Sequence, residues 1–142
     1  MAQVLAGPGG IYVSPLGRAR ETAAIALPGT PAVVDPRLAE IDTGAWEGRL
    51  KSELPKGASD LETYAAAPGG EGLDALMIRV RNFADGLRGP SIVVAHGLWG
   101  QVLRGLAQGM AFEEMGAQEN GQGCVYHLED GRERRIGSAT AE

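Results

Sequence analysis

The sequence has 142 residues, of which 44% are hydrophobic and 22% are charged. This composition excludes an intrinsically disordered chain, and the length fits a single domain over residues 1–142. A formal net charge of -5 gives no general attraction to nucleic acid or to an anionic membrane, so neither is expected as a partner. No apolar run is long enough to cross a bilayer, and residues 1–10 lack the pattern of a signal peptide, so a cytoplasmic location is expected.

Cysteine and metal-ligand patterns exclude two further classes of protein. Cys124 is the single cysteine, so the chain has no internal disulfide and no multi-cysteine metal site. We expect Cys124 to pack as a small hydrophobic residue of a strand. The sequence has no zinc or magnesium ligand cluster, and we expect no cofactor.

The first third of the chain predicts, in order, the end of a helix over residues 1–6, a buried strand over 11–13, a helix that ends near 28–29, and a short strand over 33–34. Gly7-Pro8-Gly9-Gly10 stops the first of these helices, because glycine takes the left-handed cap and proline cannot continue a helix. Ser14 is the predicted N-cap of the second helix, with Pro15 at its first position.

The rest of the chain predicts a polar irregular segment over 35–56, a short helix capped by Ser59, an amphipathic helix over 72–88, a strand over 91–95, a helix through 102–107, and a hairpin with strands over 124–128 and 132–136. The continuous apolar run at 91–95 is typical of a parallel strand covered on both faces. Alternation of strands and helices predicts an α/β fold with three αβα layers and a mostly parallel sheet, whose site lies at the carboxyl ends of the strands.

Polar residues follow two of the predicted buried strands. They are the segment from Ser14 to Arg18 and the pair His96-Gly97. Gly97 opens a helix whose free N–H groups favour an anion, and Arg18 lies within reach of the same position with a bidentate guanidinium. Two alternatives remain open: His96 is a structural residue, and Arg18 is a solvated charge on the face of its helix.

Four stretches of the sequence carry a resemblance to a known family: SPLGRARETA at 14–23, DPRLAEIDTGAWEG at 35–48, GGE at 69–71, and VVAHG at 93–97. In this order they resemble successive signatures of the histidine phosphatase superfamily, which has a phosphoglycerate-mutase-like fold. The resemblance implies that Arg18 holds the transferring phosphoryl group and that His96 donates to its oxygens. It implies that Glu40 is the general acid that protonates the leaving alkoxide and later the base that activates water. A small phosphorylated metabolite or inorganic phosphate is then the expected partner.

Other candidate residues receive weaker assignments. Glu47 competes with Glu40 for the acid role, although its position in a turn after Trp46 favours a structural hydrogen bond. Glu71 is a weaker candidate near the rim of the site. His127 lies inside the predicted hairpin, where a structural role is favoured.

The sequence departs from the family pattern at the nucleophile. The family uses the histidine of an Arg-His-Gly signature at the end of its first strand, and this sequence contains no such triplet. The family order places a strand, a loop and the start of a helix before Met1, so the domain is expected to be truncated at its N-terminus.

Three hypotheses follow from this departure. In the first, the complete gene product is a phosphomonoesterase that forms a phosphohistidine, and this chain is inactive because it lacks the nucleophile. In the second, the chain is a catalytically dead homologue that binds a phosphorylated metabolite through Arg18, His96 and Gly97; its open sheet edge is expected to cause dimerisation or aggregation. In the third, the chain is an α/β scaffold without a site. The short connection between Glu40 and His96 resembles that of the family's phosphatases, whereas its mutases carry a longer insertion there, so the resemblance implies hydrolysis over a mutase reaction.

Overall fold

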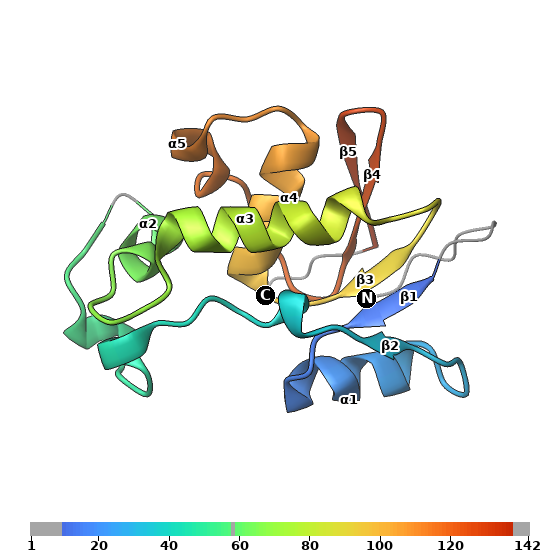
Figure 1. Cartoon of the computed structure of the whole chain (residues 1–142), viewed down its shortest axis with the longest axis horizontal. Coiled ribbons are helices and arrows are strands. Elements are labelled where there is room, and N and C mark those ends of the chain that lie inside the picture. The colour runs from blue at the N-terminus through green and yellow to red at the C-terminus, as the bar shows by residue number, and fades with distance from the viewer. Residues whose placement is uncertain (1–9, 58, 138–142) are drawn as a thin grey trace.

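A computed structural model describes residues 10–57 and 59–137, in which helices and strands alternate along the chain (Figure 1). The longer elements are β1 (Ile11–Val13), α1 (Gly17–Ala26), β2 (Val33–Val34), α2 (Asp60–Ala65), α3 (Gly72–Asp85), β3 (Ile92–Val94), α4 (Gly97–Ala107), α5 (Phe112–Met115), β4 (Val125–Glu129) and β5 (Arg132–Ile136). Three one-turn 3-10 helices, η1 (Pro36–Leu38), η2 (Gly44–Trp46) and η3 (Lys51–Glu53), occupy the segment predicted as irregular. The helix end predicted over residues 1–6 lies outside the described residues.

Three short strands form a parallel sheet in the order β2-β1-β3. Val13 of β1 is paired with Val34 on one side and with Val94 on the other. The register brings the carboxyl ends of all three strands to the same edge, where ligand sites of open α/β sheets lie. The parallel sheet confirms the predicted fold class.

Helices cover both faces of this sheet, with α1 on one side and α3 and α4 on the other (Figure 1). Alternate residues of the strands enter the two cores, as the twofold period of a strand requires. Val13 and Val94 pack against Ala19 and Ala23 of α1. Strand side chains on the other face join the larger cluster around α3 and α4. The three αβα layers predicted from the sequence are therefore present.

The start of α1 corrects one prediction. The helix begins at Gly17 and not directly after Ser14, and its N-cap position is Leu16, which supplies no side-chain cap. Ser14 cannot serve as the N-cap because it continues the sheet: its N–H donates to Val94 O at 3.0 Å. Its hydroxyl instead faces the end of β3, a placement that becomes important for the site.

The remaining elements follow their sequence signals closely. Ser59 caps α2 by accepting a hydrogen bond from the N–H of Glu62 at 3.2 Å, as the capping-box spacing predicted. The antiparallel hairpin β4–β5 turns through Asp130 and Gly131, both left-handed with φ of 53° and 76°. Cys124 is buried immediately before β4. The short α5 was not predicted.

Candidate functional site

Ser14 and His96 meet at the carboxyl edge of the sheet. Pairing of β1 with β3 sets Ser14 beside the end of β3, and its Oγ lies 2.7 Å from His96 Nε2. Ser14 is fully buried, and its Oγ also accepts the N–H of Leu16 at 3.2 Å. The sequence places Ser14 at the start of the polar segment that follows a buried strand, but a serine before a helix is first interpreted as a cap, so its contact with His96 was not predicted.

The surroundings of His96 favour its neutral form. Burial, together with the positive charges of Arg18 and then Arg79, lowers the pKa of the imidazole from 6.5 to about 4. Arg18 comes from α1 and Arg79 from α3, so both helix layers contribute charge at this ring. At neutral pH His96 is an uncharged donor and acceptor beside two cations.

Glu40 lies at the N-terminus of α4, next to His96. Its carboxylate accepts hydrogen bonds from the N–H groups of Leu98 and Trp99, both at 2.9 Å, and from its own neighbour Ile41 at 3.0 Å. The carboxylate therefore satisfies two of the free N–H groups that the sequence offered to an anion. Of the first three residues of α4, Gly97 is the one whose N–H Glu40 does not occupy. The structure thus brings Glu40 to the pair His96-Gly97, from which it is far apart in the sequence.

Arg79 holds the segment that carries Glu40. Its Nη1 donates to the carbonyl oxygens of Arg37 and Ala39, both at 2.7 Å. Its Nε and Nη2 donate to both carboxylate oxygens of Glu71, and Glu71 Oε1 accepts the N–H of Asp42 at 3.1 Å. Glu71 is therefore placed in a partly buried ion pair that fixes the chain on either side of Glu40. Arg79 was missed from the sequence, where it is one charge among several on an amphipathic helix.

The other predicted residues lie in three different settings. Arg18 is exposed in the first turn of α1, and its guanidinium makes no hydrogen bond or ion pair within the described residues. Glu47 is exposed and accepts a hydrogen bond from Thr43 Oγ1 at 2.7 Å, as expected for a structural carboxylate. His127 is paired with Arg134 across the hairpin, also as expected for a structural residue.

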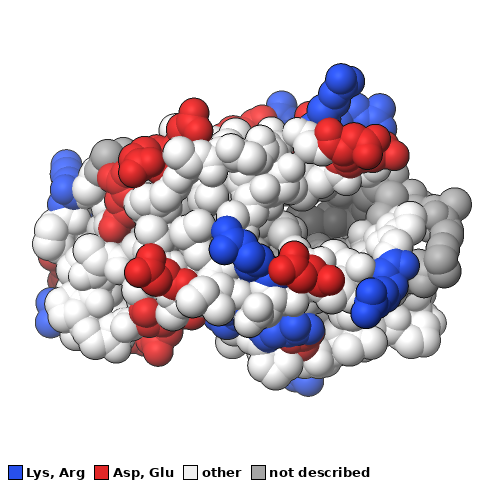
Figure 2. Space-filling model, turned by 45° about the horizontal axis from the view of Figure 1, so that its top comes forward, with Lys and Arg blue, Asp and Glu red and all other residues white. Residues whose placement is uncertain are grey.

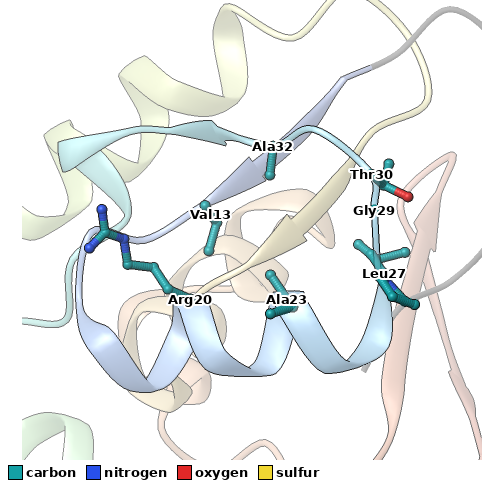
Figure 3. Close-up of a pocket in the computed structure, with 9 residues that line it drawn as sticks. Val13, Arg20, Ala23, Leu27, Gly29, Thr30 and Ala32 are labelled. Atoms are coloured by element: carbon teal, nitrogen blue, oxygen red, sulfur yellow. The ribbon is translucent and has the colours of Figure 1, made fainter.

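A pocket of about 360 Å³ lies elsewhere, between α1 and the segment that leads into β2 (Figure 3). Small and apolar side chains dominate its lining, and Arg20 is the one charged residue among them. None of Arg18, Glu40 and His96 lines it. The pocket therefore has few groups that could orient a polar ligand, and it is separate from the site at the sheet edge.

Two further features bear on a site: the charge on one face of the molecule and the grouping of metal-ligating side chains in the described residues. Basic and acidic side chains are interspersed on the face shown in Figure 2. In residues 10–57 and 59–137, no three or more His, Cys, Asp or Glu side chains are grouped to hold a metal ion. No helix in this part of the chain has the length and apolar character needed to cross a membrane.

Comparison with known proteins connects this geometry to a family. Residues 2–138 match the family model described as histidine phosphatase superfamily (branch 1). The alpha-ribazole phosphatase of Shigella flexneri superposes with a TM-score of 0.67 at 27% identity, covering 92% of this chain and 73% of that one. The protein TTHB049 of Thermus thermophilus gives a TM-score of 0.60 at 32% identity, covering 75% and 62% of the two chains.

A curated relative extends the similarity at the sequence level. The bifunctional protein Rv2228c of Mycobacterium tuberculosis is 37% identical over 108 residues. The matched region covers 66% of this chain and 30% of that protein, so this chain spans less than a third of its length.

Proposed function

Because the chain belongs to the histidine phosphatase superfamily, we propose that its gene product is a phosphomonoesterase acting on a small phosphorylated metabolite through a phosphohistidine intermediate. The observation that carries the proposal is the meeting of Glu40, His96 and the Arg18 charge at the carboxyl edge of the sheet. A phosphoryl transition state spreads negative charge over its oxygens, and fixed donors and cations stabilise that charge. This site supplies both without a carboxylate cluster for a metal.

Each residue has a distinct part in the proposed reaction. Arg18, exposed and without a protein partner in the described chain, binds the phosphoryl oxygens with its guanidinium. The Gly97 N–H and the His96 ring donate to the same group. Glu40 gives a proton to the leaving alkoxide and afterwards takes one from the attacking water.

The nucleophile is the component that these 142 residues do not supply. Their two histidines are His96 and His127, and the sequence has no Arg-His-Gly triplet. His127 lies in the β4–β5 hairpin, whereas His96 hydrogen-bonds Ser14 through Nε2. We therefore place the nucleophilic histidine in a segment of the gene product beyond this sequence, and we expect this chain by itself to form no phosphoenzyme.

Hydrolysis of aryl phosphates tests the proposal. This chain should show no turnover, whereas a form extended to include an upstream Arg-His-Gly segment should hydrolyse both activated and poor leaving groups. In the extended form, Glu40→Gln should slow poor leaving groups far more than activated ones, because only the former require the proton. The control is Glu47→Gln, which changes a carboxylate on the same connection and should leave both rates intact. Equal losses on both substrates would remove Glu40 from the acid role.

A second candidate function rests on the same missing nucleophile. A chain that keeps Arg18, His96 and Gly97 without a phosphorylatable histidine is suited to bind a phosphorylated metabolite and release it unchanged. Turnover by the extended form excludes this function. Phosphate binding by the extended form with neither turnover nor a trapped phosphoenzyme would support it.

A further inference from the structure

We infer that Ser14 is a positioning residue that fixes the neutral His96 ring in the tautomer with its proton on Nδ1. The ring would then present Nδ1–H, and not Nε2–H, as its donor to a phosphoryl oxygen. That last step rests on the proposed function, whereas the tautomer itself follows from contacts within the chain.

The direction of the Ser14–His96 hydrogen bond follows from which other donors and acceptors the Ser14 hydroxyl can reach. A serine hydroxyl has one proton to donate and two lone pairs that accept. Ser14 Oγ already accepts the N–H of Leu16 at 3.2 Å, and the described residues offer its proton no acceptor other than His96 Nε2 at 2.7 Å. If Nε2–H donated to Ser14, the hydroxyl proton of a fully buried residue would be left without a partner in the described residues, which is unfavourable. The hydroxyl therefore donates, and Nε2 accepts.

Backbone hydrogen bonds hold both residues of this pair. The N–H of Ser14 donates to Val94 O at 3.0 Å, which ties it to the strand that ends just before His96. The carbonyl of His96 accepts the N–H of Gly100 at 2.8 Å, in the first turn of α4. These bonds fix the backbone of both residues, and the contact of 2.7 Å between Ser14 Oγ and His96 Nε2 then sets the ring against the hydroxyl. The serine is thus a fixed reference for the orientation of the ring.

The charges around the ring agree with a neutral acceptor at Nε2. Arg18 faces it from α1 and Arg79 from α3, and both disfavour a second ring proton. Glu40, the carboxylate at the start of α4, is occupied by the N–H groups of Leu98 and Trp99. Positive charge at the site is therefore supplied by the arginines, and His96 adds a directed neutral donor. Nδ1 makes no hydrogen bond within the described residues, so its proton is available to a ligand.

Long-range proton–nitrogen NMR of the imidazole tests the inference in this chain, without any need for turnover. His127→Gln leaves His96 as the sole histidine, so its two ring nitrogens are assigned directly. At neutral pH we expect a protonated Nδ1 and an unprotonated Nε2. Ser14→Ala should move the ring towards the Nε2–H form that free histidine prefers, and Ser14→Thr, which keeps the hydroxyl, should restore the Nδ1–H form.

Titration with inorganic phosphate adds a second readout. Ser14→Ala should weaken phosphate binding about three- to tenfold, the effect of losing one oriented hydrogen bond. An Nε2–H tautomer in the chain with Ser14, or an unchanged tautomer in Ser14→Ala, would overturn the inference. If Ser14→Thr does not fold, these two measurements still decide it. If the ring has the expected tautomer but the chain does not bind phosphate, the proposed function is contradicted and the positioning role of Ser14 is retained.

Discussion

At the scale of single residues, the protonation of His96 links the site to the stability of the fold. Its pKa is about 4 in the folded chain against 6.5 for an unperturbed histidine. Between these values the unfolded chain binds more protons than the folded chain, so the free energy of unfolding increases as pH rises from 4 to 6.5. The contribution of His96 is complete above pH 6.5 and is lost as pH falls towards 4.

Urea unfolding at a series of pH values checks this dependence. His96→Gln should remove about 1–2 kcal/mol of the change over that window, a figure below the full conversion of the pKa shift because the ring is partly exposed. Carboxylates also titrate near pH 4, so at each pH the free energy of unfolding of His96→Gln is subtracted from that of the chain with His96. The control is His127→Gln. An identical pH profile for the chain with His96 and for His96→Gln would contradict a depressed pKa.

Of the single-residue changes, loss of Arg79 should disturb the position of Glu40 most. Among the described residues, Arg79 makes no hydrogen bond to Glu40 itself but holds the chain on either side of it. Arg79→Met would leave the carbonyl groups of Arg37 and Ala39 and the Glu71 carboxylate without their donor. We expect a loss of about 2–4 kcal/mol in urea unfolding. Amide exchange at Leu98 and Trp99, which Glu40 binds, should also accelerate.

The matched control is Arg81→Met, an exposed arginine on the same helix, which should change stability by less than about 0.5 kcal/mol. Equal effects of the two variants would show that Arg79 is an ordinary surface charge.

At the scale of elements, two loops that frame the Glu40 connection approach each other closely. A Cβ on Gly44 would lie 2.4 Å from backbone atoms of both Gly69 and Gly70, and Gly44 has φ of 49°. Gly44→Ala should therefore cost about 3 kcal/mol or more in urea unfolding, since backbone must move. Gly48 has φ of 79° but open space around it, so Gly48→Ala should cost only the backbone strain, about 1–2 kcal/mol. Equal losses of stability in Gly44→Ala and Gly48→Ala would mean that the loops at Gly44 and at Gly69-Gly70 separate without cost.

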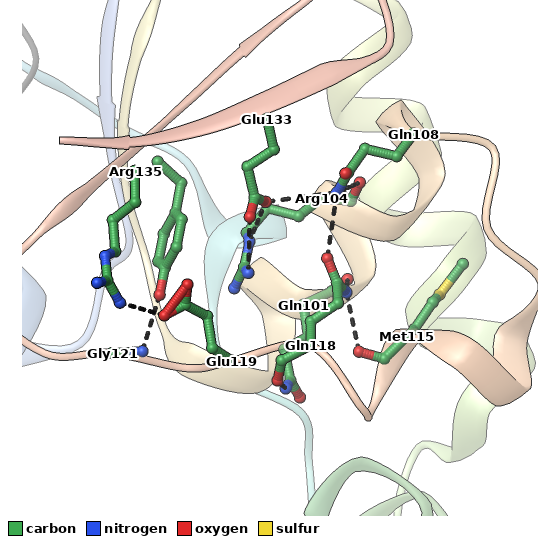
Figure 4. Close-up of polar contacts among 10 residues, drawn as sticks. Gln101, Arg104, Gln108, Met115, Gln118, Glu119, Gly121, Glu133 and Arg135 are labelled. Atoms are coloured by element: carbon green, nitrogen blue, oxygen red, sulfur yellow. Dashed lines mark hydrogen bonds and ion pairs between the residues drawn. The ribbon is translucent and has the colours of Figure 1, made fainter.

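A buried polar network joins the hairpin to α4 (Figure 4). Arg104 donates to Glu133 of β5 at 2.6 and 3.2 Å, and its guanidinium carbon lies 3.7 Å from the ring centre of Tyr126 in β4. The side chain of Arg104 is only 5% exposed. The hairpin is thus attached to the helix that begins after His96 and whose first N–H groups bind Glu40.

Arg104→Met tests this attachment, because it leaves Glu133 without its partner in a largely buried position. We expect a loss of about 3–5 kcal/mol in urea unfolding and faster amide exchange throughout β4 and β5. Arg134→Met, on the exposed face of the same hairpin, is the control. Unchanged exchange in the hairpin of the Arg104 variant would contradict the anchoring role.

At the scale of the whole molecule, sequence patterns predicted the helices and strands and the residues at strand ends. They predicted less well which side chains contact one another across the fold. Periodic apolar residues gave α3, and turn residues gave the hairpin, because these signals are local. The four-residue α5 is too short to show a helical period. The Ser14–His96 hydrogen bond depends on the register of β1 against β3, and the hydrogen bonds from Arg79 to the carbonyl groups of Arg37 and Ala39 depend on the packing of α3 against the Glu40 connection. Neither arrangement is written in any local stretch of sequence.

The family resemblance supplied what local patterns could not. It singled out Glu40 among the acidic residues of an irregular segment, and the structure sets that carboxylate against the start of α4. It did not anticipate that Glu40 would occupy N–H groups of the helix terminus expected to bind the anion. The phosphate site is therefore proposed to consist of a single helix N–H, from Gly97, together with Arg18 and His96.

Titration of the isotope-labelled chain with inorganic phosphate, followed by amide and imidazole NMR, tests this composition most directly. The account predicts that the Gly97 amide and the His96 ring shift together, and that Arg18→Gln weakens binding about tenfold or more. Arg20→Gln, which changes the arginine that lines the pocket under α1, should leave binding unchanged. Shifts confined to that pocket, or no shift at Gly97 and His96, would contradict a phosphate site at the carboxyl edge of the sheet.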